Sequence, residues 1–230
     1  MDFFYSMVKS FTAGGAFMYP ILFVGAIAIA ITIERYITLK RMGIRNQRTW
    51  SKVEPVLTSG DFDKVRELTS KDDSPIARVL SMGLALEGAV RRRDDVEKAM
   101  QESMIEIVPQ IEKRTHYLAT LANVATLLGL LGTVSGLIHS FAAVATVNPA
   151  EKANLLSASI SEAMNCTAFG LMTAVPILVV HAFLTSKTTG LSDGLEAAAV
   201  RFLNALAARQ AARAQSRLEL VHPEQQAKSA

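Results

Sequence analysis

Three stretches of the chain contain no charged side chain, and they dominate its hydrophobic pattern. They cover residues 10–33, 115–150 and 163–186 and are 24, 36 and 24 residues long. An α-helix needs about 20 apolar residues to cross the hydrocarbon core of a bilayer. The pattern therefore predicts three transmembrane helices, at residues 16–35, 116–145 and 161–186.

The charged residues lie between and after these stretches, where they predict helices outside the bilayer. Turn-forming residues break the segment 36–115 in two places, and Asp61 and Ser74 are typical N-caps there, with Pro75 at a first helical position. The sequence predicts short helices near residues 50–58, 61–70 and 75–90. A longer helix is expected from Asp94 through the second apolar stretch, because little but a proline interrupts it.

These elements define an all-α fold class: a polytopic membrane protein with three transmembrane helices and long helices extending into the cytoplasm. After the third span the pattern stays helical and rich in alanine, which predicts a cytoplasmic C-terminal helix at residues 187–220. The last ten residues, 221–230, are polar and are expected to be disordered.

Orientation follows from the basic residues that flank the spans, because such residues favour the cytoplasmic side. Ten of them fall on one side of the bilayer: Arg35, Lys40, Arg41, Arg45, Arg48, Lys98, Lys113, Arg114, Lys187 and Arg201. The other side has only Lys9 and Lys152. We therefore expect residues 1–15 and the connection 146–160 to be periplasmic, and residues 36–115 to form a cytoplasmic helical domain.

Composition agrees with a membrane protein and argues against a nucleic-acid partner. Half of the residues are hydrophobic, and the mean hydropathy is +0.26. The net charge is only +3, so the basic residues are better explained as an orientation signal than as a nucleic-acid surface. The first apolar stretch lacks a small-residue cleavage pattern and is expected to be a retained helix rather than a signal peptide.

The second span separates into a small face and a bulky face when its residues are placed at 100° intervals. The small face carries Ala122, Ala125, Thr126, Gly129, Gly132, Thr133, Gly136, Ser140 and Ala143, with His139 at its margin. The bulky face carries Val124, Leu127, Leu130, Leu131, Val134, Ile138 and Phe141. Small faces allow helices to pack closely in a bilayer, whereas bulky faces can contact lipid.

The third span repeats this pattern less strictly. Its small face carries Ala163, Thr167, Gly170 and Ala174, and His181 continues it toward the cytoplasm. Two threonines at similar depth could line a polar path, or each could bond back to its own helix. The single cysteine, Cys166, can form no intrachain disulfide and is expected to be a small residue at a helix contact.

No span contains an acidic residue at its centre, although proton transfer through a membrane requires titratable groups at depth. Glu162 lies near the outer end of the third span, and His139 and His181 lie toward span ends. Either histidine could be a relay group or a hydrogen-bonded packing residue. If the chain conducts ions, a partner is expected to supply the central carboxylate.

Two blocks of this sequence resemble the ExbB/TolQ/MotA proton-channel family. The first is LGLLGTVSG at residues 128–136, followed by Ser140 and Phe141. The second comprises ISEA at 160–163, TAFGL at 167–171 and AVP at 174–176. The sequences ERY at 34–36 and Gly60-Asp61 also fit, and three spans with an outside N-terminus match the ExbB/TolQ branch. Asn165 and Cys166 depart from the small apolar residues expected there.

The resemblance implies a homopentamer in the bacterial inner membrane that encloses a dimer of a single-span ExbD/TolR-like protein. The partner's transmembrane Asp would exchange protons beside Thr133 and Thr167, while Glu162 matches a glutamate at the outer entrance. Proton flow would drive rotation that is passed to a TonB/TolA-like protein. The resemblance implies no cofactor and no enzymatic activity.

Two other functions remain open at the level of the sequence. One is a membrane scaffold that assembles partners without conducting ions, for which the small faces alone suffice. The other is a stator for surface motility. A membrane enzyme is the least supported class, because the spans lack a nucleophile with a base, or a cluster of metal ligands. The sequence does not distinguish uptake from envelope maintenance, or protons from sodium.

Overall fold

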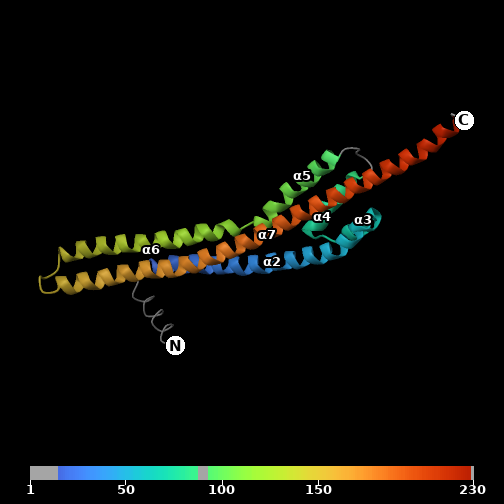
Figure 1. Ribbon diagram of the computed structural model, residues 1–230. Helices are drawn as coiled ribbons and strands as arrows, with labels where there is room; N and C mark the ends of the chain where they lie inside the picture. The colour runs from blue at the N-terminus through green and yellow to red at the C-terminus, as the bar shows by residue number, and fades with distance from the viewer. Residues whose placement is uncertain (1–14, 88–92, 229–230) are drawn as a thin grey trace. The chain divides into compact units, whose positions relative to one another are not determined.

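The computed structural model describes residues 15–87 and 93–228, and the side chains of residue 214 and of residues 216–228 are not described. The described residues form helices and no β-strand, which confirms the all-α fold class (Figure 1). The helices are α2 (Met18–Thr58), α3 (Phe62–Ser70), α4 (Pro75–Leu86), α5 (Arg93–Glu112), α6 (Thr115–Val144) and α7 (Lys152–Lys228). Most of the expected periplasmic segment 1–15 lies outside the described residues.

The chain divides into two compact units, each described here by itself. The first, called the membrane unit, comprises Met1–Ile37 and Lys113–Ser186. The second, called the charged unit, comprises Thr38–Glu112 and Lys187–Ala230. Helices α2 and α7 contribute to both units without interruption.

Three helical segments are long and apolar enough to cross a membrane. They belong to α2, to α6 and to α7, and their most apolar windows have mean hydropathies of 1.8, 1.8 and 1.9. They coincide with the three stretches that the sequence pattern singled out. The protein is therefore a multi-pass membrane protein.

The structure corrects the expectation of one helix from Asp94 through the second span. Helix α5 ends at Glu112 and α6 begins at Thr115, with Arg114 between them at φ 66°. Few non-glycine residues adopt this left-handed conformation, so tertiary contacts have to hold it. At the break, Arg114 donates to the Glu34 carboxylate at 2.9 Å. Pro109 does not end α5, because it lies on the exposed face, where water can bond the carbonyl that a proline leaves unpaired.

Three other predicted boundaries also differ from the structure. The short helix expected at residues 50–58 is the end of α2, which continues through Pro55. The connection expected at residues 146–160 is shorter, because α7 begins at Lys152. Helix α7 continues through Lys228, so residues 221–228 of the tail that was expected to be disordered are helical.

In the charged unit, the predicted caps begin α3 and α4. The Asp61 side chain accepts a hydrogen bond from the Lys64 N–H, and Ser74 accepts one from the Ala77 N–H. Such caps satisfy N–H groups that a helix leaves unpaired at its start. Sequence analysis therefore located both helix starts correctly, although α4 ends at Leu86, before the expected residue 90.

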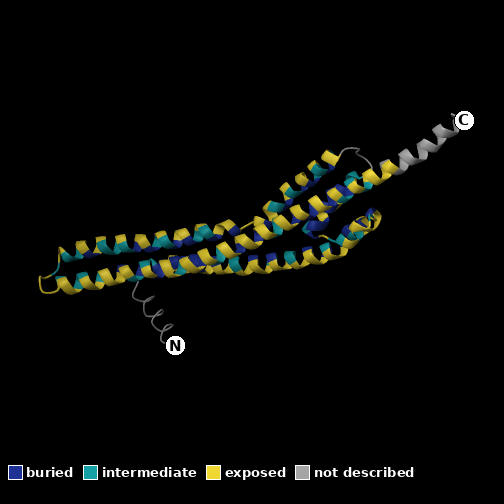
Figure 2. Cartoon of the chain, viewed as in Figure 1, coloured by how far each residue is buried: buried dark blue, intermediate teal, exposed yellow. Residues whose placement is uncertain are grey.

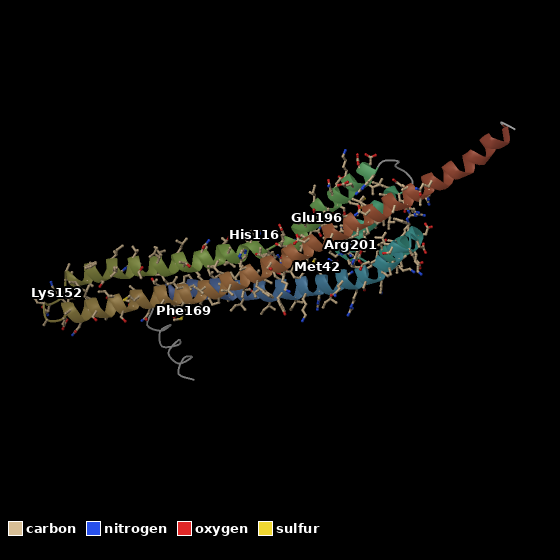
Figure 3. The ribbon with its side chains drawn as sticks, viewed as in Figure 1. Met42, His116, Lys152, Phe169, Glu196 and Arg201 are labelled. Atoms are coloured by element: carbon tan, nitrogen blue, oxygen red, sulfur yellow. The ribbon has the colours of Figure 1, made fainter. Side chains whose placement is uncertain are left out.

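The core of the charged unit joins α3, α4 and α5 to the part of α7 around Phe202. Phe62 and Phe202 are fully buried and meet edge to face, with ring centroids 5.7 Å apart. Arg201 lies on α7 (Figure 3). Its side chain binds Glu54 of α2 and lies over the Trp50 ring. Arg209 of α7 pairs with Glu87 and stacks on Phe62. These contacts fix α7 in the charged unit by both apolar and charged groups.

A polar cluster around Asp72 fastens α2 to the turn before α4. The Asp72 carboxylate accepts hydrogen bonds from Thr49, from the Ser74 N–H at 2.9 Å and from Arg45 at 3.3 Å. Burial raises the pKa of the Asp72 carboxyl, but these hydrogen bonds outweigh burial, and the pKa lies below its usual range. The ionised carboxylate therefore stabilises the folded unit.

Asp72→Asn should lower the free energy of unfolding at neutral pH, by at most about 1 kcal/mol because the group is partly solvated. A lowered folded-state pKa contributes stability above the unfolded pKa of about 4, and this contribution is lost as the pH falls through the folded pKa. The variant and the wild type should therefore converge in acid when denaturant unfolding is measured against pH. Asp73→Asn, at the exposed neighbouring position, is the control and should match the wild type at both pH values.

Candidate functional site: the small face between α6 and α7

Burial in the membrane unit follows the two faces of the second span. The buried residues of α6 include Ala122, Ala125, Gly129, Gly132 and Ser140. All seven bulky residues assigned to the other face are exposed, with exposures between 36% and 63%. Figure 2 shows buried and exposed residues alternating along the helices. In a bilayer these exposed side chains can contact lipid or another subunit. The small face of α6 is therefore a helix contact, as the pattern predicts.

Two glycines, one on α6 and one on α7, bring the two helix backbones into contact. A Cβ added to Gly170 would lie 2.8 Å from the Ala125 carbonyl oxygen and 3.0 Å from the Gly129 Cα. A Cβ added to Gly129 would lie 3.2 Å from the Gly170 Cα. Backbone atoms are the obstacle at both positions, so no side chain can move aside. Only glycine permits this contact.

The same contact continues along both helices toward the α6–α7 connection. A Cβ on Gly132 would collide with the Cys166 side chain, and one on Gly136 would lie 3.1 Å from the Ala163 Cβ. Cys166 is 1% exposed and Ala174 is 2% exposed. The cysteine that departs from the expected pattern is thus the small residue that fills the space over Gly132. Its role as a packing residue agrees with the expectation from the sequence.

Thr133 and Thr167 lie at the same level of this contact, but their hydrogen bonds differ. Each follows one member of the packed pair Gly132 and Cys166. The Thr167 hydroxyl donates across the helix contact to the Gly129 carbonyl at 2.9 Å, whereas the Thr133 hydroxyl donates to Leu130 of its own helix at 2.6 Å. Both are partly exposed. The Thr167 hydroxyl therefore forms an interhelical hydrogen bond, whereas the Thr133 hydroxyl bonds back to its own helix.

Glu162 belongs to the first part of α7, and its side chain lies against Gly15, just before α2 begins. Its carboxylate occupies the space that a Cβ on Gly15 would fill, and Gly15 adopts φ 73°. The Gly15 carbonyl accepts the first hydrogen bond of α2, from the Met18 N–H at 3.3 Å. The sequence placed Glu162 at a span end but offered no signal for this contact, because the two residues are far apart along the chain.

Gly15→Ala should displace the Glu162 carboxylate and strain the backbone at once. Gly60→Ala is a matched control, because Gly60 adopts φ 76° with no atom within 4 Å of an added Cβ. Both substitutions place alanine at a positive φ, which costs about 1 kcal/mol in each case. Because only Gly15 contacts Glu162, only Gly15→Ala should also change the labelling of Glu162 by a carbodiimide. Equal labelling of Glu162 in wild type, Gly15→Ala and Gly60→Ala would contradict the contact.

The two histidines are at opposite ends of the membrane unit. His139 lies ten residues beyond Gly129 and His181 eleven beyond Gly170, in antiparallel helices, so about 30 Å separates them along the helices. The His139 Nδ1 donates to the Ser135 carbonyl at 2.9 Å, and the His181 Nε2 lies 3.5 Å from the Thr185 hydroxyl. The structure does not bring them together, and each has a partner on its own helix.

The membrane unit therefore offers hydroxyls, carbonyls and glycines at its centre, and carboxylates at its ends. Between Thr115 and Ala150 and between Ala163 and Ser186 the sequence has no Asp, Glu, Lys or Arg. Within the described parts of the chain, no three His, Cys, Asp or Glu side chains are grouped as metal ligands. Such an arrangement can solvate a proton carrier but has no carboxylate at its centre.

Comparison with known proteins places this arrangement in a family. Residues 71–197 match the model of the MotA/TolQ/ExbB proton channel family. The biopolymer transport protein ExbB-like 3 of Synechocystis sp. is 30% identical over 168 residues, which cover 73% of this chain and 79% of that protein. ExbB of Neisseria gonorrhoeae is 26% identical over 204 residues, or 80% and 89% of the two chains.

A TolQ protein of the Tol-Pal system, from Haemophilus influenzae, is 32% identical over 96 residues, which cover 42% of each chain. The matches confirm the resemblance that the two sequence blocks carry, and they include the whole of α6 and the apolar part of α7. The chain belongs to the MotA/TolQ/ExbB proton channel family, in its ExbB/TolQ-like branch.

Proposed function

We propose that this protein is the channel subunit of an inner-membrane motor that converts the proton motive force into mechanical work. Five copies would enclose a dimer of a single-span protein of the ExbD/TolR type. The movement would be delivered to a TonB/TolA-type protein that spans the periplasm. The relatives named for biopolymer transport and for the Tol-Pal system support energy transduction of this kind.

One observation carries the proposal: a tightly packed polar contact in the membrane unit has no carboxylate of its own. Thr167 and Thr133 lie at one level of the α6–α7 contact, in stretches that have no Asp, Glu, Lys or Arg. A proton path needs a titratable group at this depth. The partner's transmembrane Asp would supply it.

The hydrogen bonds of the two threonines favour the protonated form of such an Asp. A hydroxyl has one donor and two acceptor lone pairs. A carbonyl can only accept, so the Gly129 carbonyl uses the Thr167 donor and the Leu130 carbonyl uses the Thr133 donor. Both hydroxyls then offer only lone pairs, which suit the O–H of a neutral carboxyl or a hydrated proton.

The outer entrance would be formed near Glu162, and the cytoplasmic side would hold the charged unit. The ten-to-two distribution of flanking basic residues supports a periplasmic N-terminus and a cytoplasmic C-terminus. Glu162 then lies on the side from which protons enter. His139 would be near the same side, and His181 near the exit.

The proposal is tested in cells that depend on this protein and on a neighbouring single-span protein for a proton-driven process. Changing the partner's transmembrane Asp to Asn should abolish the process as completely as deleting either gene, while the assembled complex keeps its mass. A scaffold that conducts no ions predicts instead that the Asp→Asn complex remains fully active. Mass measurement of the purified complex would also test the proposed stoichiometry, five copies of this chain with two copies of the single-span partner.

A further inference from the structure

Helix α2 carries a row of basic residues on the side that faces away from the core of the charged unit. Arg41, Arg45, Arg48 and Lys52 follow one another at spacings of four, three and four, so they share one helix face. All four are exposed, and Ile44 beside them is 41% exposed. From residue 40 to residue 52 the helix contains five basic residues and no acidic one. We call this surface the basic face.

Helix α5 carries the opposite charge on its outward side. From Arg93 to Glu112 it has six acidic residues and two basic ones. Glu102, Glu106 and Glu112 are exposed there, and Ile105 in their midst is 75% exposed. Ile105 gives this charged surface an apolar centre. We call this surface the acidic face.

The two faces are not paired with each other within the chain. Arg45 pairs with Asp72, and Glu106 pairs with Arg78. Across the described residues, no salt bridge uses Arg41, Arg48, Lys52, Glu102 or Glu112. The unpaired charges are therefore of opposite sign on two separate surfaces.

The residues of the two faces also lie at similar distances along their own helices from the limits of the charged unit. Ile44 lies seven residues after Ile37, where α2 leaves the membrane unit, and Ile105 lies eight residues before Lys113, where the chain re-enters that unit. At 1.5 Å per residue these positions are about 10 and 12 Å along their helices. Arg48 and Glu102 are each eleven residues from the same boundaries. Exposed isoleucines and opposite charges thus occur in the same order.

Lipid head groups do not account for the whole basic face. Arg48 and Lys52 are 15 and 19 residues beyond Ile33, the end of the first charge-free stretch. This corresponds to about 22 and 28 Å of helix, whereas salt screens exposed charges beyond about 8 Å. A second copy of the chain supplies an acidic face whose residues lie at matching distances along the helix. No further kind of partner is then needed.

We propose that the basic face of α2 docks against the acidic face of α5 in the next copy of this chain. The contact joins two different surfaces, so successive copies repeat it head to tail and close into a ring. Complementary charge sets the register and the choice of partner more than it supplies affinity. The inference rests on the proposed homo-oligomer and assigns the surfaces that join its subunits outside the membrane.

Disulfide formation between copies tests this docking in the full chain, in native membranes, with Cys166→Ala as background. Ile44→Cys and Ile105→Cys chains with different tags should form a mixed dimer on oxidation, and one chain with both changes should form a ladder of multimers. Neither variant alone should cross-link. Met82→Cys, at an exposed position of α4, is the matched control and should not join Ile44→Cys.

Charge reversal gives a second, independent readout. Arg48→Glu or Glu102→Arg alone should reduce the Ile44-to-Ile105 cross-link several-fold, and both changes in one chain should restore it. The docking would be overturned if no mixed dimer formed although the complex kept its mass. A disulfide-linked dimer of the Ile105→Cys chain alone would also overturn it. Proton-driven activity measured in the same strains separates this failure from failure of the proposed function.

Discussion

Gly170→Ala should push α6 and α7 apart and destabilise the membrane unit. The added Cβ meets the Ala125 carbonyl oxygen at 2.8 Å and the Gly129 Cα at 3.0 Å, so one of the two backbones has to move. Overpacking of this kind costs about 1–3 kcal/mol. For a chain of this size the midpoint of thermal unfolding should fall by roughly 3–10 °C, measured on the detergent-purified protein.

Gly190→Ala is the matched control, because it makes the same change in the same helix. A Cβ at Gly190 has no atom within 4 Å, and the residue is exposed. Alanine is favoured over glycine in a helix by up to about 1 kcal/mol, so this variant should be as stable as the wild type or slightly more stable. Equal midpoints for Gly170→Ala and Gly190→Ala would show that the two glycines are not in backbone contact.

Thr167→Val should reduce proton-driven activity by about tenfold while leaving the protein folded and assembled. Valine has nearly the shape of threonine, so packing is kept, but the hydroxyl that donates to Gly129, and that would accept in the proposed path, is lost. A hydrogen bond of this type contributes about 0.5–1.5 kcal/mol, and about 1.4 kcal/mol corresponds to a factor of ten. Activity is compared in cells at equal protein level.

Two further variants decide whether the hydroxyl itself matters. Thr167→Ser keeps the hydroxyl and should retain most of the activity. Thr126→Val is a control on the same small face, since the Thr126 hydroxyl bonds only to Ala122 of its own helix, at 3.1 Å. If Thr167→Val is as active as Thr126→Val, Thr167 serves packing and the path lies elsewhere.

Sequence periodicity predicted the membrane unit well because one local rule governs it. In a bilayer, close helix contact requires small residues, and the small face of α6 is buried while Val124, Leu127 and Ile138 are exposed. The caps at Asp61 and Ser74 were likewise predicted from local hydrogen bonding. These features depend on residues within one or two turns of each other, which a single sequence displays directly.

Features fixed by distant residues were not predicted. The break between α5 and α6 depends on Arg114 in a left-handed conformation, held by Glu34 from another helix. The position of the Glu162 carboxylate depends on Gly15, just before α2 begins. The packing role of Cys166 depends on Gly132 of α6, against which its side chain lies. Each requires knowing which helices are neighbours, and no periodicity in one segment contains that information.

The central claim is that this chain forms a proton path that is complete only with a carboxylate from another protein. Its own centre offers two hydroxyls that face carbonyls and two glycines in backbone contact. Its Asp, Glu, Lys and Arg residues lie outside residues 10–33, 115–150 and 163–186, the apolar stretches of the three spans. Conduction should therefore require the partner and should disappear with the partner's Asp.

Proton uptake into liposomes under a potassium diffusion potential, followed with an internal pH dye, tests this claim most directly. Liposomes that contain this chain together with its single-span partner should take up protons. Liposomes with this chain alone, with the partner's Asp changed to Asn, or with Thr167→Val should show little uptake above the empty liposomes. Equal uptake by the chain alone and by the complex would contradict the account.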